Sequence, residues 1–196
     1  MTWTSNVSFC KWNGVTCCLR RQRVVSLNLS SVGLVGNISR SLGNLSFLRI
    51  LDLSNNNLHG HIPYQLESFS RLRRPFSSNR LTCSIPASLS TCHSLVGLSL
   101  DENHLTRDIP PELAFLPNLN LINLIGNNLT GRIPNTFGNM SSLRDLVLQE
   151  NSLERHIPWE LGMLPNLSEL LLDFNNLTGE IPSSLSNCTS LQVFSA

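Results

Sequence analysis

The pair of residues closest to metal-ligand spacing is His59 and His61, which flank Gly60, with Cys83 about one repeat further along the chain. A zinc site needs three or four ligands, and the sequence nominates no others nearby, so we interpret both histidines as solvated loop residues. The chain also lacks a G-x-x-x-x-G-K-[ST] phosphate loop, kinase H-R-D and D-F-G triplets and a G-x-S-x-G elbow. We therefore predict that this chain is not an enzyme and holds no metal or cofactor.

The cysteines predict one disulfide. Cys10 and Cys17 stand seven residues apart around Trp12 and Gly14, ahead of the repeated part of the chain. A bridge between them suits a small cap over the open end of the first repeat, which would otherwise expose several aliphatic side chains at about 1.5–3 kcal/mol each. Cys18 is left over, either free or competing for the bridge.

The other three cysteines fall inside the repeats. Cys92 and Cys188 occupy a column otherwise filled by leucine, methionine or phenylalanine, so we expect buried thiols that act as small apolar residues. Cys83 replaces a glycine and is expected to point outward as an unpaired thiol. A Cys83–Cys92 bridge is the less favoured alternative.

A 24-residue repeat positions all of these residues except the three cysteines at 10, 17 and 18. Its clearest copy is LNLINLIGNNLTGRIPNTFGNMSS at 119–142, and copies starting at Leu95, Leu119, Leu143 and Leu167 follow one another without a gap. The alternating residues of a short strand place leucines on one face and variable residues on the other. After each strand an asparagine stands where the chain bends inward, and its amide can pair with backbone groups that the bend leaves open. The predicted asparagine ladder is Asn56, Asn79, Asn103, Asn127, Asn151 and Asn175.

The third copy, from Leu72, departs from this pattern. The interval from Leu58 to Leu81 is one residue shorter than the others, and Arg73-Arg74-Pro75-Phe76 occupies the strand. With Phe76 aligned to Leu53, Pro75 falls in mid-strand, where it cannot donate a ladder hydrogen bond. We expect a distorted strand. A basic bend that exposes Arg73 and Arg74 is the alternative.

The repeats define the expected organisation of the chain. Residues 1–23 form a partial cysteine-containing cap, residues 24–190 form seven repeats of which 72–94 is degenerate, and residues 191–196 begin a truncated eighth. No secretory signal opens the chain, and Met1 leads directly into what reads as the middle of a module. We expect a fragment of a longer protein.

Composition excludes several partner classes. Charged residues make up 14% of the chain and the net charge is +1, so no overall field favours nucleic acid or an anionic membrane. No run approaches the roughly 18–20 apolar residues of a membrane helix. Contact with a membrane is expected only through missing C-terminal parts, and the oligomeric state stays open.

The pattern L-x-x-L-x-L-x-x-N-x-L-x-G-x-I-P-x-x-L-G-x-L, with C-x-W-x-G-V-x-C ahead of it, resembles the plant-type extracellular leucine-rich-repeat family over essentially the whole chain. The strongest likeness is to ectodomains of plant leucine-rich-repeat receptor-like kinases of the immune-receptor group. Cys83 and Arg107 depart from the family's glycine column. The resemblance implies an α/β repeat solenoid: a right-handed superhelix with a parallel concave sheet and a convex side of 3-10 helices and loops. It also implies recognition of peptides or partner ectodomains on the concave or lateral face.

Nine Asn-x-Ser/Thr sequons support a secretory route, more than composition alone predicts. We expect extracellular or cell-surface localisation, with the plasma membrane reached only through the full-length parent. The candidate glycosylation sites are Asn6, Asn37, Asn44, Asn128, Asn139, Asn166 and Asn176; the two further sequons are at Asn28 and Asn187.

The open face of the sheet carries the candidate binding residues. Alternation predicts that Leu121, Ile125, Val147 and Leu171 form one apolar patch, edged by acidic residues and suited to a peptide with apolar and basic side chains. Glu102, Glu150 and Phe174 follow at the turn, and Gly97 and Ser99 are expected on the same face. The full candidate set is Asp101, Leu121, Asn123, Ile125, Asp145, Val147, Gln149, Glu169, Leu171 and Asp173.

Three functions fit this sequence. The favoured one is a ligand-binding ectodomain fragment of a receptor-like kinase, non-catalytic itself although the full-length parent is a serine/threonine kinase. The alternatives are a secreted protein resembling polygalacturonase inhibitors, and a truncated or decoy receptor fragment. The reading frame after Ala196 discriminates among them.

Overall fold

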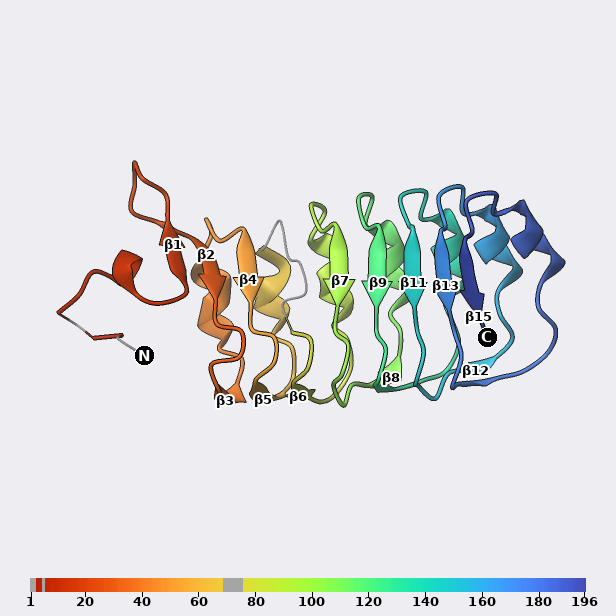
Figure 1. The fold of residues 1–196 in the computed structure, drawn as a ribbon, viewed down its shortest axis with the longest axis horizontal. Helices are drawn as coiled ribbons and strands as arrows, with labels where there is room; N and C mark the ends of the chain where they lie inside the picture. The colour runs from red at the N-terminus through yellow and green to blue at the C-terminus, as the bar shows by residue number, and fades with distance from the viewer. Residues whose placement is uncertain (1–2, 5, 69–75) are drawn as a thin grey trace.

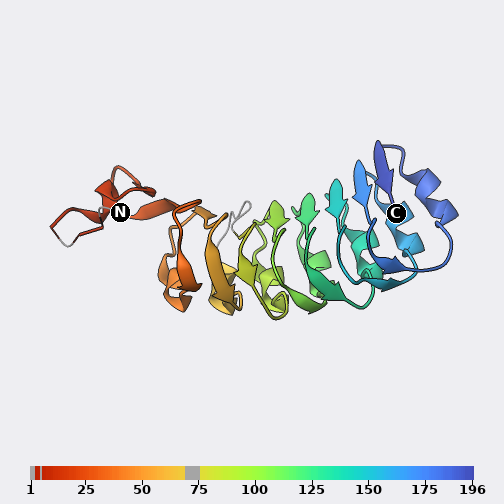
Figure 2. The same cartoon turned by 60° about the horizontal axis from the view of Figure 1, so that its bottom comes forward.

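The structure, a computed structural model, describes residues 3–4, 6–68 and 76–196. The chain winds as a solenoid in which each repeat that is fully described contributes a strand, a turn, a short second strand and a 3-10 helix (Figure 1). The first strands line the inner side of the curve and the helices line its outer side (Figure 2). This confirms the predicted parallel concave sheet with 3-10 helices opposite it.

The concave strands form two sheets. The first contains β1 (Val15–Cys17), β2 (Val24–Asn28) and β4 (Ile50–Asp52). The second contains β7 (Gly97–Ser99), β9 (Leu121–Asn123), β11 (Asp145–Val147), β13 (Glu169–Leu171) and β15 (Val193–Ser195), all parallel. The distorted strand or basic bend predicted for Arg73, Arg74 and Pro75 lies outside the described residues.

The second strands run along the flank of the solenoid in shorter parallel groups. These are β3 (Val35–Asn37), β5 (Asn57–Gly60) and β6 (Arg80–Leu81); β8 (Thr106–Asp108) and β10 (Asn128–Thr130); and β12 (Glu154–Arg155) and β14 (Asn176–Leu177). The outer helices are η2 (Arg40–Asn44), η3 (Tyr64–Ser68), η4 (Ala87–Thr91), η5 (Pro111–Phe115), η6 (Asn135–Asn139), η7 (Trp159–Met163) and η8 (Ser183–Asn187).

Proline sets where the outer helices begin. The N-cap residue of each helix from η4 to η8 is a proline with φ between −61° and −68°, the angle that its ring imposes. In η2 the proline is replaced by Ser39, whose side chain instead accepts a hydrogen bond from the Ser41 N–H at 3.2 Å. The serine keeps the helix start by capping it with its side chain.

The asparagine ladder is confirmed along the solenoid. Asn127 Nδ2 donates to the carbonyls of Leu100 and Leu124, both at 3.0 Å, and its Oδ1 accepts from the Leu105 N–H at 3.0 Å. Each ladder amide thus joins its own bend to the preceding turn, and equivalent bonds are made by Asn56, Asn79, Asn103, Asn151 and Asn175.

The same bonds locate the shortened repeat. The other ladder asparagines donate to a carbonyl 27 residues earlier in the chain and accept from an N–H 22 residues earlier. For Asn79 both separations are one residue shorter: it donates to the Leu53 carbonyl, 26 residues earlier, and accepts from the Leu58 N–H, 21 residues earlier. The residue is therefore missing between Leu58 and Phe76, while the ladder stays in register. Phe76 is 1% exposed and fills the place of Leu53, as the alignment predicted.

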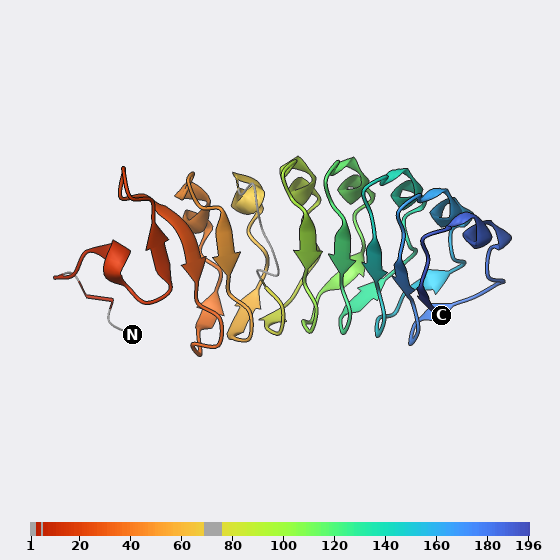
Figure 3. The same ribbon diagram turned by 45° about the horizontal axis from the view of Figure 1, so that its top comes forward.

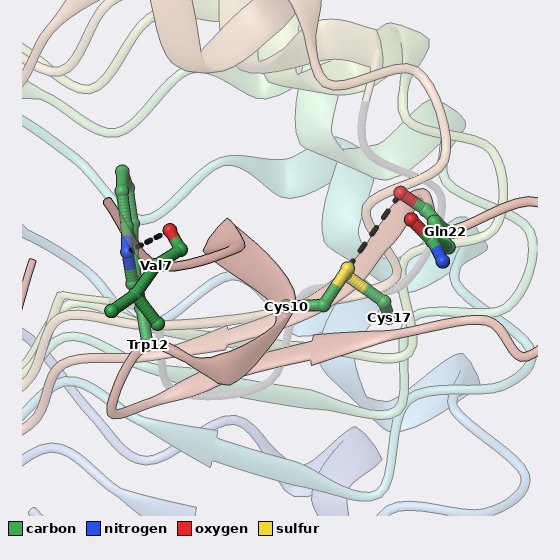
Figure 4. The surroundings of a disulfide bond; sticks show 5 residues. All are labelled: Val7, Cys10, Trp12, Cys17 and Gln22. Atoms are coloured by element: carbon green, nitrogen blue, oxygen red, sulfur yellow. Dashed lines mark hydrogen bonds between the residues drawn. A yellow bond between two sulfur atoms is a disulfide. The ribbon is translucent and has the colours of Figure 1, made fainter. Parts of the chain in front are cut away.

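The first turn carries a different unit. A disulfide joins Cys10 to Cys17, as predicted, between η1 (Phe9–Lys11) and β1, which pairs antiparallel with β2 (Figure 4). Trp12 donates its indole N–H to the Val7 carbonyl at 3.2 Å and stacks on Trp3 with ring centroids 4.9 Å apart. Inside the repeats, Cys92 and Cys188 are buried, as predicted, and Cys83 is an exposed free thiol.

The repeat position that is usually glycine, the glycine column, has a left-handed backbone conformation with positive φ. Gly60, Gly131 and Gly179 have φ of +78°, +73° and +88°, and the residues that replace glycine there keep the conformation: Cys83 at +69°, Arg107 at +68° and Arg155 at +71°. A side chain in this region strains the backbone. Arg155 was not recognised from the sequence as a member of this column.

We predict that Arg107→Gly and Arg155→Gly each raise the free energy of unfolding by about 1 kcal/mol, because glycine adopts positive φ without the Cβ clash. Urea denaturation measures the change. Arg132→Gly is the matched control, since Arg132 is an exposed arginine outside the positive-φ set and its replacement gains nothing. Equal or lower stability of the two test variants would contradict the strain.

Candidate ligand-binding surface

The concave face of β7 to β15 presents its side chains in rows across the strands. The register pairs Leu121 with Gly97 and Asp145, and Asp145 in turn with Glu169. A second row pairs Asn123 with Val147, and Val147 with Leu171. All ten predicted candidates are half-buried: Asp101, Leu121, Asn123, Ile125, Asp145, Val147, Gln149, Glu169, Leu171 and Asp173.

The apolar candidates are interleaved with polar ones. Val147 and Leu171 are direct cross-strand neighbours, whereas Leu121 belongs to the row of Asp145 and lies one diagonal step from Val147. The side chain of Leu121 leans over Gly97, with its Cδ2 3.7 Å from where a Cβ on that glycine would lie. The face therefore offers an apolar pair at Val147 and Leu171 bordered by carboxylates.

Serine hydroxyls hold three of these carboxylates in place, which the sequence did not indicate. Ser168 Oγ donates to Asp145 Oδ1 at 2.9 Å, and other serines donate to Asp101 and Asp173. Asp101 Oδ1 accepts from Ser77 Oγ at 2.7 Å and from Ser99 Oγ at 2.6 Å. Ser99 is only 1% exposed, so it lies beneath the open face and supports the carboxylate. Ser99 was expected on the open face, and its hydroxyl does bond to Asp101 there, but both Ser99 and Gly97 are buried and so are not exposed for contact.

Asp173 is fixed in the same way at the other end of the face. Its Oδ1 accepts hydrogen bonds from Ser195 Oγ and from Gln149 Nε2, the latter at 2.6 Å. The Ser195 bond first, and the Gln149 bond with it, hold the pKa of Asp173 below its ordinary value, outweighing the opposite effect of burial. Asp173 therefore stays ionised in mildly acidic solution, and part of its accepting capacity is already used.

We predict an acid-dependent loss of stability from Asp173. Because its folded pKa is lowered, its contribution is fully present above the unfolded value of about 3.9 and disappears as the pH falls through the folded pKa. Asp173→Asn should be less stable than wild type at pH 6, and the gap should close in stronger acid, as followed by urea denaturation between pH 2 and 6. Glu180→Gln, at an exposed position, should show no such closing gap.

The residues just before the ladder asparagines form the rim of the concave face at the turn that follows each strand. Glu102, Glu150 and Phe174 all have positive φ, between +52° and +57°. The Glu102 carboxylate lies over Gly126, with Oε1 3.1 Å from where a Cβ there would lie. Phe174 is 76% exposed, so a large aromatic ring is displayed from a strained backbone position at the rim.

A separate cavity of about 550 Å³ opens on the flank between the second strands and η6 and η7. Asp108, Arg132, Glu154, Arg155 and Trp159 are among its lining residues. Sequence reasoning missed it, because these side chains come from three repeats and meet only through the stacking of the coil. The one feature of the sequence that could have indicated this cavity was a second arginine, Arg155, in the glycine column.

The seven candidate glycosylation asparagines, and the two further sequons, are all exposed. Among the residues that the structure describes, no group of three or more histidine, cysteine or acidic side chains is placed to hold a metal ion. Within the same residues, no helix is long and apolar enough to cross a membrane.

Comparison with known proteins identifies the repeats. A family model described as Leucine Rich Repeat matches residues 47–69, 118–140 and 166–188. Over 72 residues the chain is 49% identical to the LRR receptor-like serine/threonine-protein kinase EFR of Arabidopsis thaliana, a stretch that is 37% of this chain and 7% of that protein. The chain thus spans only a small part of this relative.

Solved structures match nearly the whole chain. The ectodomain of the receptor kinase GASSHO1/SCHENGEN3 from Arabidopsis thaliana, in complex with CASPARIAN STRIP INTEGRITY FACTOR 2, superimposes with a TM-score of 0.88 at 37% identity, over 98% of this chain and 26% of that one. The Arabidopsis receptor kinase HAESA, in complex with the peptide hormone IDA and the co-receptor SERK1, gives 0.84 at 37% identity, over 95% and 32%.

The matched part of these kinases is a non-catalytic ectodomain, which indicates an extracellular location. The asparagine ladder, the parallel concave sheet and the helix-lined outer side are all present in this chain. A solved structure of a Pollen Receptor Kinase 3 also matches, with a TM-score of 0.78 at 30% identity, over 91% of this chain and 88% of that one. The chain therefore belongs to the leucine-rich-repeat family, and within it is similar to the ectodomains of plant leucine-rich-repeat receptor kinases.

Proposed function

We propose that this chain is a ligand-binding segment of a receptor-like kinase ectodomain, and that it binds a peptide bearing apolar and basic side chains on the concave face of β7 to β15. The observation that carries the proposal is the Val147–Leu171 pair flanked by Asp145, Glu169 and Asp173. An apolar centre with ionised groups around it suits one anchoring side chain and a neighbouring cation.

The relatives support a peptide or an ectodomain as the partner class. HAESA was solved with a peptide hormone and a co-receptor together. A rigid solenoid needs no folding step to present its face, so binding here adds no cost for ordering the protein backbone to the cost of ordering the peptide. In the full-length parent, we propose, a membrane helix and a kinase domain follow beyond residue 196, so that the ectodomain stands outside the plasma membrane.

We further propose the domain limits expected from the sequence: a cap over residues 1–23, seven repeats over 24–190 and the start of an eighth over 191–196. In support, β1 pairs antiparallel with β2 while the strands after it are parallel, and β15 adds to β13 in the register of a repeat strand.

Display selection tests the proposed ligand class. The glycosylated chain is immobilised and used to select from a library of random 12-residue peptides, with elution by salt. The expected result is enrichment of sequences that combine an apolar residue with lysine or arginine, released at high ionic strength because the carboxylates are partly exposed. Enrichment of acidic sequences would overturn the proposal. Inhibition of a polygalacturonase without peptide capture would favour the inhibitor alternative.

A further inference from the structure

The last residues of four consecutive outer helices alternate between a large apolar residue and an asparagine. The last residue is Phe115 in η5, Asn139 in η6, Met163 in η7 and Asn187 in η8. The four positions are 24 residues apart and equivalent in the repeat, and the helices stand side by side along the outer edge of the solenoid (Figure 3). Asn139 is therefore flanked, one repeat away on each side, by Phe115 and Met163.

The two flanking side chains are large, apolar and unburied. Phe115 is 70% exposed and Met163 is 57% exposed. The next residue in each repeat, Leu116 or Leu164, is fully buried and already completes the core at this level. The exposed pair therefore contributes little to the interior, and most of its apolar area is available to a group that lies over the helix ends.

Asn139 is positioned to carry a chemical group that lies over Phe115 and Met163. It opens the sequon Asn139-Met140-Ser141, both polar residues of the sequon are exposed, and its side-chain amide makes no hydrogen bond within the described residues. Asn166 differs, because its Nδ2 donates to the Ser141 carbonyl at 2.8 Å. The Asn139 side chain is thus free of the contact that holds Asn166 against the neighbouring repeat.

We propose that Asn139 carries an N-linked glycan whose first N-acetylglucosamine packs on Phe115 and Met163. Transfer forms a bond between Asn139 Nδ2 and C1 of the sugar, breaks the C1–oxygen bond of a lipid-linked pyrophosphate donor, and releases the lipid pyrophosphate and the amide proton. The C–H face and acetyl methyl group of the sugar cover the apolar side chains while its hydroxyls face water. The inference rests on the extracellular route of the proposed function.

A double-mutant cycle in protein secreted from plant or insect cells tests the packing. Mass spectrometry should find Asn139 modified. Phe115→Ala should lower the Tm of the glycosylated protein by about 2–4 °C, the shift that one ordinary contact gives in a chain of this size, and should leave the Tm unchanged in the Asn139→Gln background. The coupling vanishes without the sugar because Phe115 itself supports no core contact.

Asn128 is the matched control sequon. The equivalent residues in the adjacent repeats are His104 and Ser152, so a glycan on Asn128 has no apolar pair to cover. Asn128→Gln should therefore leave the effect of Phe115→Ala intact.

An unmodified Asn139, or a Phe115→Ala effect that is the same with and without the sugar, would overturn the proposal. Concentration-dependent self-association that Phe115→Ala abolishes would also overturn it and assign the apolar pair to a protein interface. Peptide capture is measured on the same Asn139→Gln protein and should be unchanged, because the concave face lies on the opposite side. Failure of the glycan proposal is thus distinguishable from failure of the binding function.

Discussion

Replacing Asn127 with leucine should lower the free energy of unfolding by about 3–4 kcal/mol, the largest stability loss we expect from a single polar residue in this chain. Leucine has a similar volume but its side chain neither donates nor accepts, so the buried Leu105 N–H loses its partner. The carbonyls of Leu100 and Leu124 each lose one of two donors and keep those of Asn103 and Asn151. The unpaired N–H costs about 1–3 kcal/mol and each lost carbonyl bond about 0.5–1.5 kcal/mol, and partial relaxation of the bend reduces the sum.

Guanidinium denaturation followed by circular dichroism measures this loss. Asn128→Leu is the matched control, because Asn128 is the exposed neighbour of Asn127 and surface substitutions usually change stability by no more than about 0.5 kcal/mol. Asn175→Leu should fall between the two, since Asn175 makes the same kind of bonds but is only partly buried. A loss below about 1 kcal/mol for Asn127→Leu would show that water replaces the ladder bonds.

The double substitution Val147→Arg with Leu171→Arg should weaken binding of the selected peptide about 100-fold or more. The two side chains are cross-strand neighbours, so both arginines enter the centre of the proposed site, remove its apolar pair and neutralise the surrounding carboxylates. Both positions are half-buried on the open face, so the fold and its circular dichroism should persist.

A control variant separates the local effect from the added charge. Thr106→Arg with Thr130→Arg places the same two charges on the flanking strands β8 and β10, where both threonines are exposed. Isothermal titration calorimetry should show nearly unchanged affinity for this variant. Equal weakening in both variants would mean that overall charge, and not the concave face, governs binding.

Most of the fold could be predicted from the sequence because a repeat protein repeats its local rules. One well-formed copy specified the ladder asparagines and the inward leucines for the remaining turns, and the glycine column for all of them except the turn with Arg155. Even the missing residue near Phe76 was visible as a break in the period, and the hydrogen bonds of Asn79 confirm it. The Cys10–Cys17 bridge followed from spacing in the same way.

The candidate surface was predictable only in part. Strand alternation placed Val147, Leu171 and Asp173 on one face, but which residues become neighbours depends on the register between repeats. The Ser77 bond to Asp101 joins two neighbouring repeats, and so do the Ser195 and Gln149 bonds to Asp173. The flank cavity near Trp159 needs three repeats to form. Such features depend on the stacked coil and have no signature within a single repeat.

The central claim, that the concave face of β7 to β15 contacts the ligand, is tested most directly by photo-crosslinking. A photoreactive benzoylphenylalanine replaces Gln149 on the concave face or Trp159 on the outer side, and each protein is irradiated with the selected peptide. Crosslinking from position 149 and none from position 159 is the predicted result. Crosslinking from position 159 alone would place the ligand on the flank or the helices and contradict the account.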